Sequence, residues 1–339
     1  MDYQEVLKNA RECIGPNCKV CPVCNGQACK NRIPGPGAKG VGDVAIRNYE
    51  KWQNVRVNLD TIFEQRPLNT KFSLFGKEFA YPFFAAPIGS VQMHYGDKFT
   101  DAEYDEILTT SCAKNGIAAF VGDGPAPELM QASVAAVKKA NGIGIPTIKP
   151  WDMETIRKRL ELAKQSGAFA VAMDIDAAGL PFLHNQNPPA GGKSVEQLRE
   201  IVKMAEIPFI LKGIMTPNAA RKAKEAGVQG IVVSNHGGRV LDQCMSTAEV
   251  LPSIVEEVGK SMIVMVDGGI RSGTDIFKAL AMGADAVLLA RPFVPAIYGA
   301  KEDGVAALVN KLGRELEDTM TMCGAFSLNE IQRSMISLT

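Results

Sequence analysis

Residues 230–239 read Gly-Ile-Val-Val-Ser-Asn-His-Gly-Gly-Arg, an apolar run that changes directly into a polar loop. Residues 230–233 predict a buried strand, so Ser234, His236 and Arg239 follow at its carboxyl end. In (β/α)₈ barrels the active site lies at the carboxyl ends of the strands. A histidine can transfer a proton near neutral pH, and an arginine can bind a carboxylate through two hydrogen bonds. The stretch therefore indicates a catalytic loop. The alternative is a structural turn with a surface histidine and arginine.

The alternation of an apolar run and a helical pattern repeats along most of the chain. Helical patterns, such as residues 153–166, 217–226 and 275–282, separate the runs, and residues 304–320 add a last helix. The apolar runs are residues 83–87, 117–121, 144–148, 168–175, 208–211, 230–233, 262–266 and 284–289. Eight such units predict an α/β fold, a closed (β/α)₈ TIM barrel. A doubly wound open sheet is the competing fold, but no G-x-G-x-x-G follows the first run.

Length and composition limit the classes of function. The 339 residues are enough for a barrel of ~250 residues with extensions. Lys and Arg total 37, as do Asp and Glu, so the zero net charge favours neither a nucleic-acid partner nor a membrane surface. No apolar run reaches ~18 residues, and the amino terminus lacks a basic-then-apolar signal pattern. We therefore expect a cytoplasmic protein without a membrane span.

Glycines and arginines follow the last two apolar runs. Asp267-Gly268-Gly269-Ile270-Arg271 comes after the seventh run, and Ala290-Arg291 after the eighth. Backbone N–H groups at such glycines, a helix amino terminus and an arginine together favour a bound phosphate, and barrels often bind phosphate at these two loops. Two tight turns with solvated arginines are the alternative. Lys212, after the fifth run, would point into the same end of the barrel, where its charge could hold an anionic cofactor ring. The alternative is a capping lysine.

The first 40 residues are predicted to form a separate extension before a barrel of residues 41–339. A short helix around residues 3–11 precedes five cysteines in the spacing C-x4-C-x2-C-x2-C-x4-C, namely Cys13, Cys18, Cys21, Cys24 and Cys29. The spacing favours a [4Fe–4S] cluster, which needs four of them, and zinc is the second interpretation. Without a secretion signal a disulfide framework is least favoured, and five cysteines without a metal are the remaining alternative.

Several longer segments resemble the FMN-dependent 2-hydroxy-acid oxidases and dehydrogenases, such as glycolate oxidase and lactate oxidase. They are LKGI at 211–214, IVVSNHGGRVLD at 231–242, DGGIRSGTDIFKALAMGADAVLLARP at 267–292 and ELEDTMTMCGAFSLNEIQRSMI at 315–336. The resemblance covers roughly residues 34–338. It implies FMN across the barrel mouth, a small carboxylate substrate, and a homotetramer or homo-octamer, while the electron acceptor is left open.

The resemblance also implies roles for single residues. His236 would remove a proton from the substrate, Asp176 would pair with His236, Arg239 would bind the substrate carboxylate, and Lys212 would lie beside the flavin. The remaining implied FMN contacts are Ala86, Pro87, Ile88, Gly122, Thr147, Asp174 and Ser234 near the ring, and Asp267, Gly269, Arg271, Ala290 and Arg291 toward the phosphate.

The sequence departs from the family pattern where the substrate would bind. Ile33 and Lys149 stand where members that oxidise simple 2-hydroxy acids carry tyrosines, and residues 177–182 lack the family's second carboxylate-binding arginine. Lys149 could replace one carboxylate anchor. An FMN enzyme of another class, such as an isomerase or reductase, and a flavin and iron–sulfur electron-transfer protein without a small substrate are therefore kept as alternatives.

Overall fold

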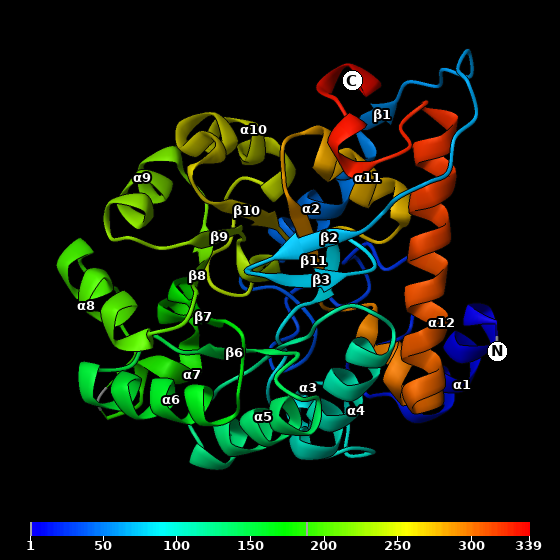
Figure 1. Ribbon diagram of the computed structural model, residues 1–339. Helices are drawn as coiled ribbons and strands as arrows, with labels where there is room; N and C mark the ends of the chain where they lie inside the picture. Colours follow the sequence, from blue (N-terminus) through cyan, green and yellow to red (C-terminus); the bar gives the residue numbers. More distant parts are fainter. Residues whose placement is uncertain (1, 188) are drawn as a thin grey trace.

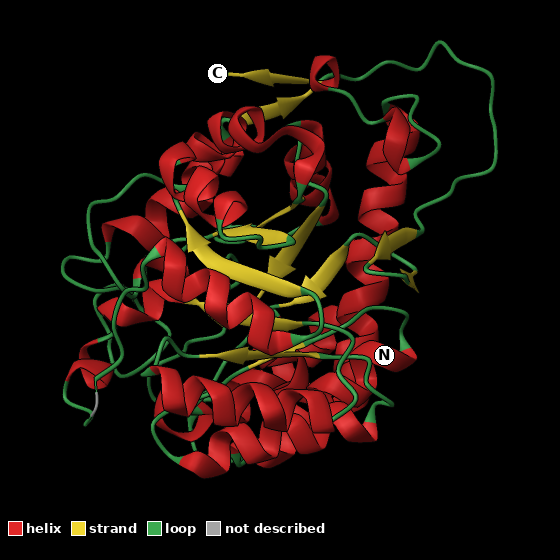
Figure 2. Ribbon diagram, turned by 60° about the vertical axis from the view of Figure 1, so that its left-hand side comes forward, coloured by secondary structure: helices red, strands yellow, loops and turns green. Residues whose placement is uncertain are grey.

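Eight parallel strands form the centre of the molecule and are surrounded by helices (Figure 2). The computed structural model describes residues 2–187 and 189–339. The strands are β4 (Phe83–Ala85), β5 (Phe120–Val121), β6 (Ile145–Ile148), β7 (Val171–Asp174), β8 (Phe209–Ile214), β9 (Gly230–Val233), β10 (Ile263–Val266) and β11 (Ala286–Leu289). Each lies within or overlaps one predicted apolar run, so the predicted TIM barrel is confirmed.

The barrel closes between its first and second strands. The strand order runs from β4 through β11, β10, β9, β8, β7 and β6 to β5. The Ala85 N–H donates to the Ala118 carbonyl at 3.1 Å, which joins the two ends of this order. Helices cover the outside and side chains fill the inside, so the strands are buried on both faces and read as continuous apolar runs. One boundary differs from expectation: β8 extends to Ile214, and Lys212 therefore lies within a strand.

Helices alternate with the strands around the barrel (Figure 1). Several begin at residues that cap them: the Thr216 side chain accepts from the Ala219 N–H, and Asp152 accepts from Glu154 and Thr155. The helices of this layer are α3 (Val91–Tyr95), α4 (Asp101–Lys114), α5 (Pro127–Lys139), α6 (Met153–Gln165), α7 (Pro181–His184), α8 (Val195–Ala205), α9 (Pro217–Glu225), α10 (Thr247–Val258), α11 (Gly273–Ala281) and α12 (Phe293–Met322).

The amino-terminal segment packs on the barrel. Helix α1 (Tyr3–Cys13) lies beside α12, and its Val6 and Ala10 are fully buried (Figure 1). The predicted last helix is longer than expected, since α12 starts at Phe293 and bends at Ala300 and Lys301. Residues 14–42, all of them described, contain no helix or strand and lead to α2 (Asp43–Gln53). The boundary at residue 40 stays a prediction.

The remaining strands lie outside the barrel. Strand β1 (Val55–Val57) pairs with β12 (Ile336–Leu338), and β2 (Phe72–Leu74) forms a hairpin with β3 (Lys77–Phe79). Phe75, in the turn of this hairpin, lies beside Gly230 at the start of β9. The hairpin therefore covers the amino end of the barrel, and the carboxyl end stays free for a site. No helix in the described ranges is long and apolar enough to cross a membrane.

Candidate active site

The carboxyl ends of the strands open into one cleft. The segments that follow the strands form most of its wall, together with part of the amino-terminal segment. The predicted residues that line it are Ala86, Pro87, Ile88, Gly122, Lys149, Lys212, His236, Arg239, Asp267, Gly269, Arg271, Ala290 and Arg291. Thr147, Asp174, Asp176 and Ser234 lie directly behind this wall, fully or largely buried. The structure thus brings all of these predicted residues together, while their roles toward ligands stay predictions.

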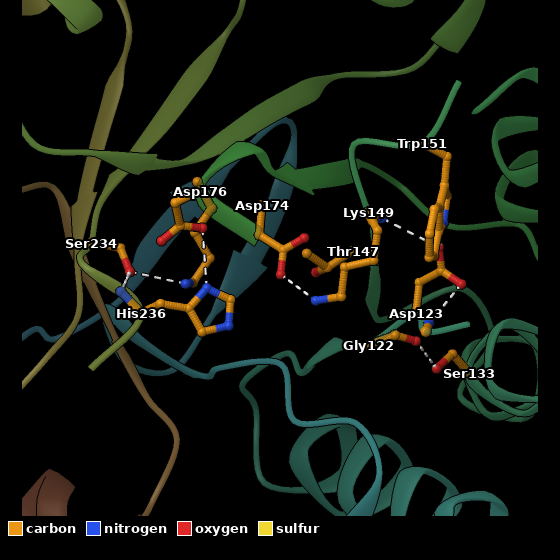
Figure 3. A network of polar contacts seen from close by, with 12 residues as sticks. Gly122, Asp123, Ser133, Thr147, Lys149, Trp151, Asp174, Asp176, Ser234 and His236 are labelled. Atoms are coloured by element: carbon orange, nitrogen blue, oxygen red, sulfur yellow. Dashed lines mark hydrogen bonds and ion pairs between the residues drawn. The ribbon is translucent and has the colours of Figure 1, made fainter. Parts of the chain in front are cut away.

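His236 is held by a carboxylate (Figure 3). Its Nδ1 lies 3.1 Å from Asp176 Oδ1, and its backbone N–H donates to Ser234 Oγ at 3.1 Å. Burial would raise the pKa of Asp176, but the charges of His236 and Lys212 hold it below its ordinary value. Asp176 is therefore ionised at neutral pH and accepts the Nδ1 proton. This leaves Nε2 of the neutral ring as the free base.

Lys212 is a buried cation surrounded by acidic groups. Its Nζ donates to Ser234 Oγ at 2.9 Å and lies 3.4 Å from Asp267 Oδ2. Burial lowers the pKa of a lysine, but here the carboxylates of Asp267, Asp176 and Asp174 outweigh burial and raise it. Lys212 therefore keeps a full positive charge at the floor of the cleft.

Lys149 makes a second buried ion pair, with Asp174 at the end of β7 (Figure 3). The distance from Nζ to Asp174 Oδ2 is 2.5 Å. The backbone of Lys149 is fixed by Asp123, whose Oδ2 accepts from the Lys149 N–H at 3.2 Å and from Trp151 Nε1 at 2.7 Å. Lys149, which departs from the family pattern, thus pairs with Asp174. Its backbone is positioned by Asp123, which the sequence did not single out.

Arg239 lies against the amino-terminal segment. Its Nη1 donates to the carbonyls of Gly35 and Gly37 at 2.7 and 2.9 Å. These contacts orient the guanidinium but occupy only one of its two terminal nitrogens. Ile33, at the family's tyrosine position, is not among the residues that line the cleft.

His94 is a cleft residue that the sequence analysis missed. The Gly35 N–H donates to its Nδ1 at 3.0 Å, so we assign the proton of the neutral ring to Nε2. Burial and the neighbouring Arg239 lower the pKa of His94 to about 4, which keeps the ring neutral at pH 7. Nε2 lies 3.2 Å from Arg239 Nη2. Both nitrogens can only donate, so an acceptor placed between them would satisfy both.

The loops after β9 and β10 are braced by helix α2. Asn48 and Asn235 exchange two side-chain hydrogen bonds at 2.7 and 2.9 Å, and Trp52 Nε1 donates to the Gly268 carbonyl. Gly269 has a φ of +84°, and a Cβ there would lie 2.2 Å from the Asn48 carbonyl oxygen. Only glycine fits this contact, so the backbone after β10 is held close to α2.

Four of the five amino-terminal cysteines line one cavity, and the fifth does not. Cys18, Cys21, Cys24 and Cys29 line a second cavity beside Arg271 and Arg291, whereas Cys13 is not part of it. Burial would raise the pKa of Cys24, but Arg271 and Arg291 lower it. In the described ranges, no group of three or more His, Cys, Asp or Glu side chains is placed to hold a metal ion.

Comparison with known proteins identifies the family. A family model described as FMN-dependent dehydrogenase matches residues 36–187 and 185–338, almost the whole barrel. The chain belongs to this family. The resemblance to this family that the sequence predicted is thereby confirmed.

Individual relatives match over shorter lengths or at lower identity. A peroxisomal (S)-2-hydroxyacid oxidase of Arabidopsis thaliana is 46% identical over 144 residues, 42% of this chain and 39% of the oxidase. An L-lactate dehydrogenase of Bartonella tribocorum is 44% identical over 147 residues, 43% of this chain and 38% of the dehydrogenase. A solved structure of mandelate oxidase has a TM-score of 0.82 at 24% identity over 99% of this chain and 97% of its own, which shows a shared fold.

The residues of the cleft fit the FMN that defines the family. Two buried polar atoms in the wall, Asp267 Oδ1 and Arg271 Nη2, have no hydrogen-bond partner within the described chain. A buried polar atom without a partner is costly, and a ligand with hydroxyl and phosphate groups supplies both the donor and the acceptor that are missing. Helix α11 starts next to them with Ser272 as its cap, so its amino terminus also favours an anion.

Proposed function

We propose that the protein oxidises the hydroxyl-bearing carbon of a small 2-hydroxy carboxylate, with FMN as cofactor. The observation that carries this proposal is the His236–Asp176 pair at 3.1 Å, in one cleft with the guanidinium of Arg239. The names of the relatives support it, since they are a 2-hydroxyacid oxidase, a lactate dehydrogenase and a mandelate oxidase. A general base and a carboxylate anchor are the two groups that such a substrate needs from the protein.

The proton is taken by His236. Bound FMN supplies the acceptor of the hydride equivalent that leaves the substrate carbon. Nε2 of His236 accepts the hydroxyl proton, and the Asp176 carboxylate stabilises the imidazolium that results. Lys212, with its retained charge, would lie by the cofactor and compensate negative charge that develops there. Asp267, Gly269, Arg271, Ala290 and Arg291 would hold the ribityl phosphate chain.

The substrate carboxylate is held by Arg239 together with His94. Arg239 Nη2 and the protonated Nε2 of His94 lie 3.2 Å apart, and neither finds an acceptor in this contact. A carboxylate oxygen that lies beside both nitrogens accepts a hydrogen bond from each. His94 thus replaces a donor that the family's tyrosine would supply. Lys149 contributes its charge to the other side of the cleft, but its tight pairing with Asp174 makes it a secondary anchor.

The experiment is an anaerobic spectrum of the flavin during addition of a panel of 2-hydroxy acids. We expect at least one of them, lactate, glycolate or mandelate, to bleach the oxidised flavin absorbance and to yield the 2-oxo acid. If none of a broad panel bleaches the flavin while dithionite does, the proposal is wrong, and an electron-transfer protein without a small substrate becomes the better account.

Four further parts of the account are proposals of the same standing. The amino-terminal cysteines bind a metal centre, either iron–sulfur or zinc. The electrons leave through an acceptor other than oxygen. The chain forms a homotetramer or homo-octamer, as the family resemblance implies. Its cytoplasmic location stays a prediction. Metal analysis of the purified protein tests the metal centre, and size-exclusion chromatography with light scattering tests the oligomeric state.

A further inference from the structure

We propose that Cys18, Cys21, Cys24 and Cys29 are the ligands of a [4Fe–4S] cluster, that Cys13 is not a ligand, and that the cluster carries electrons away from the flavin cleft. The binding site follows from the structure alone, whereas its role in electron transfer rests on the proposed function.

The four cysteines line a single cavity between residues 18–29 and the barrel. All four residues are partly buried, and all four contribute to the lining of this cavity. The segment that carries them has no helix or strand of its own between residues 14 and 42. A long irregular segment that is nevertheless ordered needs other cross-links, and four metal–thiolate bonds would supply them.

Cys13 is already engaged elsewhere. It is the last residue of α1, and its Sγ donates to the Tyr298 carbonyl of α12 at 3.1 Å. Lys98 Nζ lies 3.1 Å from the same sulfur. The thiol of Cys13 therefore joins α1 to the outer helices and faces away from the cavity that the other four line.

The number and sequence spacing of the cysteines favour a cluster over a single ion. Cys18, Cys21 and Cys24 follow the pattern C-x2-C-x2-C, and Cys29 comes five residues further on. This core is typical of iron–sulfur ligation, whereas zinc sites usually separate two C-x2-C pairs by a longer loop. In the described part of the chain no group of three or more His, Cys, Asp or Glu side chains is placed to hold a metal ion.

The position of the cavity links it to the flavin cleft. Pro36, Tyr95, Arg271 and Arg291 line both cavities, so one layer of side chains separates them. Arg271 also donates from Nε to the Cys24 carbonyl at 2.9 Å. An oxidised cluster with four thiolates carries a net charge of about −2, and the two arginines compensate that charge as they would compensate a phosphate.

Oxidation of the substrate hydroxyl to a carbonyl releases two electrons and two protons. The cluster accepts one electron at a time, passing from the 2+ to the 1+ state, and gives each electron to an external one-electron carrier protein before accepting the next. His236 takes one proton and releases it to water after product leaves, and the other proton returns to water when the flavin is reoxidised.

The test compares the full-length protein with two cysteine variants after purification under argon. We expect about four iron and four sulfide per chain in the wild type, and an electron paramagnetic resonance signal after reduction with dithionite. The double variant Cys21→Ser/Cys24→Ser should lose iron, sulfide and signal while its flavin is still bleached by substrate. Its reoxidation by a one-electron acceptor should slow by at least tenfold. The matched control Cys13→Ser should keep all of these properties.

Four outcomes would overturn the proposal. One zinc per chain without sulfide refutes the cluster, and the absence of any metal refutes the site. Loss of iron in Cys13→Ser refutes the ligand assignment, and unchanged reoxidation in the cluster-free double variant refutes the electron-transfer role. If the double variant does not fold, the iron and sulfide contents of the wild type and of Cys13→Ser still test the cluster, the site and the ligand assignment. A flavin that no 2-hydroxy acid bleaches would refute the proposed function and leave the cluster assignment standing.

Discussion

At the scale of single residues, the cleft contains two hydrogen-bond donors, on Arg239 and His94, that face each other without an acceptor. Arg239 donates from Nη1 to two carbonyls of the amino-terminal segment, and its Nη2 faces the protonated Nε2 of His94. Two donors that face each other repel, and their contact is favourable only when an anion lies between them. This arrangement is the physical reason for assigning the substrate carboxylate to this corner.

Replacing His94 tests that assignment. The His94→Phe variant removes the Nε2 donor, and a hydrogen bond to a charged group contributes roughly 1.5–3 kcal/mol. We therefore expect the KM for the substrate to rise about 10- to 100-fold with kcat nearly unchanged, since the contact is made in both ground and transition states. His94→Gln keeps one donor and one acceptor and should stay close to wild type. An unchanged KM in His94→Phe would remove His94 from the site.

Asp176 acts through His236 and gives a second prediction. In Asp176→Asn the amide oxygen can still accept from Nδ1, but the negative charge that stabilises the imidazolium is lost. We expect kcat to fall by about 100-fold or more and the acidic limb of its pH profile to move to lower pH, because a neutral amide stabilises the imidazolium less than a carboxylate does. Stopped-flow reduction of the flavin across pH 6–9 measures both. A normal rate with a normal pH profile would contradict the role of Asp176.

At the scale of elements, two helices fix the end of β5 through a buried acid. Asp105 on α4 lies 2.6 Å from Ser133 Oγ on α5, which in turn lies 2.5 Å from the Gly122 carbonyl at the cleft wall. Burial raises the pKa of Asp105 to about 8, although the Ser133 hydroxyl lowers it in part. At neutral pH the protonated acid therefore donates to Ser133, and Ser133 donates to Gly122.

This group makes stability depend on pH in a defined direction. The folded-state pKa lies above the unfolded value, so the stability that Asp105 contributes is full below about pH 4 and is lost as the pH rises through 8. Asp105→Asn mimics the protonated acid and does not ionise. Relative to wild type it should gain on the order of 4 kcal/mol between pH 5 and pH 8, since each pKa unit is 1.36 kcal/mol.

Thermal unfolding at pH 5 and at pH 8 measures this difference. The exposed Asp303 on α12 offers a matched control, and Asp303→Asn should unfold as the wild type does at both pH values. A shift of the Asp105→Asn midpoint that is the same at pH 5 and pH 8 would mean that Asp105 is ionised in the folded protein.

At the scale of the whole molecule, the sequence predicted the site residues that lie in the same strand–loop unit as an apolar run. Residues such as His236, Asp267 and Arg291 follow an apolar run directly, and the barrel brings all strand ends to one side. His94 could not be found in this way, because it comes from α3 and meets Arg239 145 positions later only after the barrel closes. The five cysteines look equivalent in the sequence, yet α1 extends to Cys13 and turns its thiol toward α12.

The central claim is that His236 takes the substrate proton in this barrel, and the rate of anaerobic flavin reduction in His236→Asn tests it most directly. Asparagine removes the base but keeps a polar side chain of moderate size, so FMN should stay bound with its normal oxidised spectrum. We expect reduction by the best 2-hydroxy acid to slow by about 100- to 10,000-fold relative to wild type. Reduction at the wild-type rate, with FMN bound, would contradict the account.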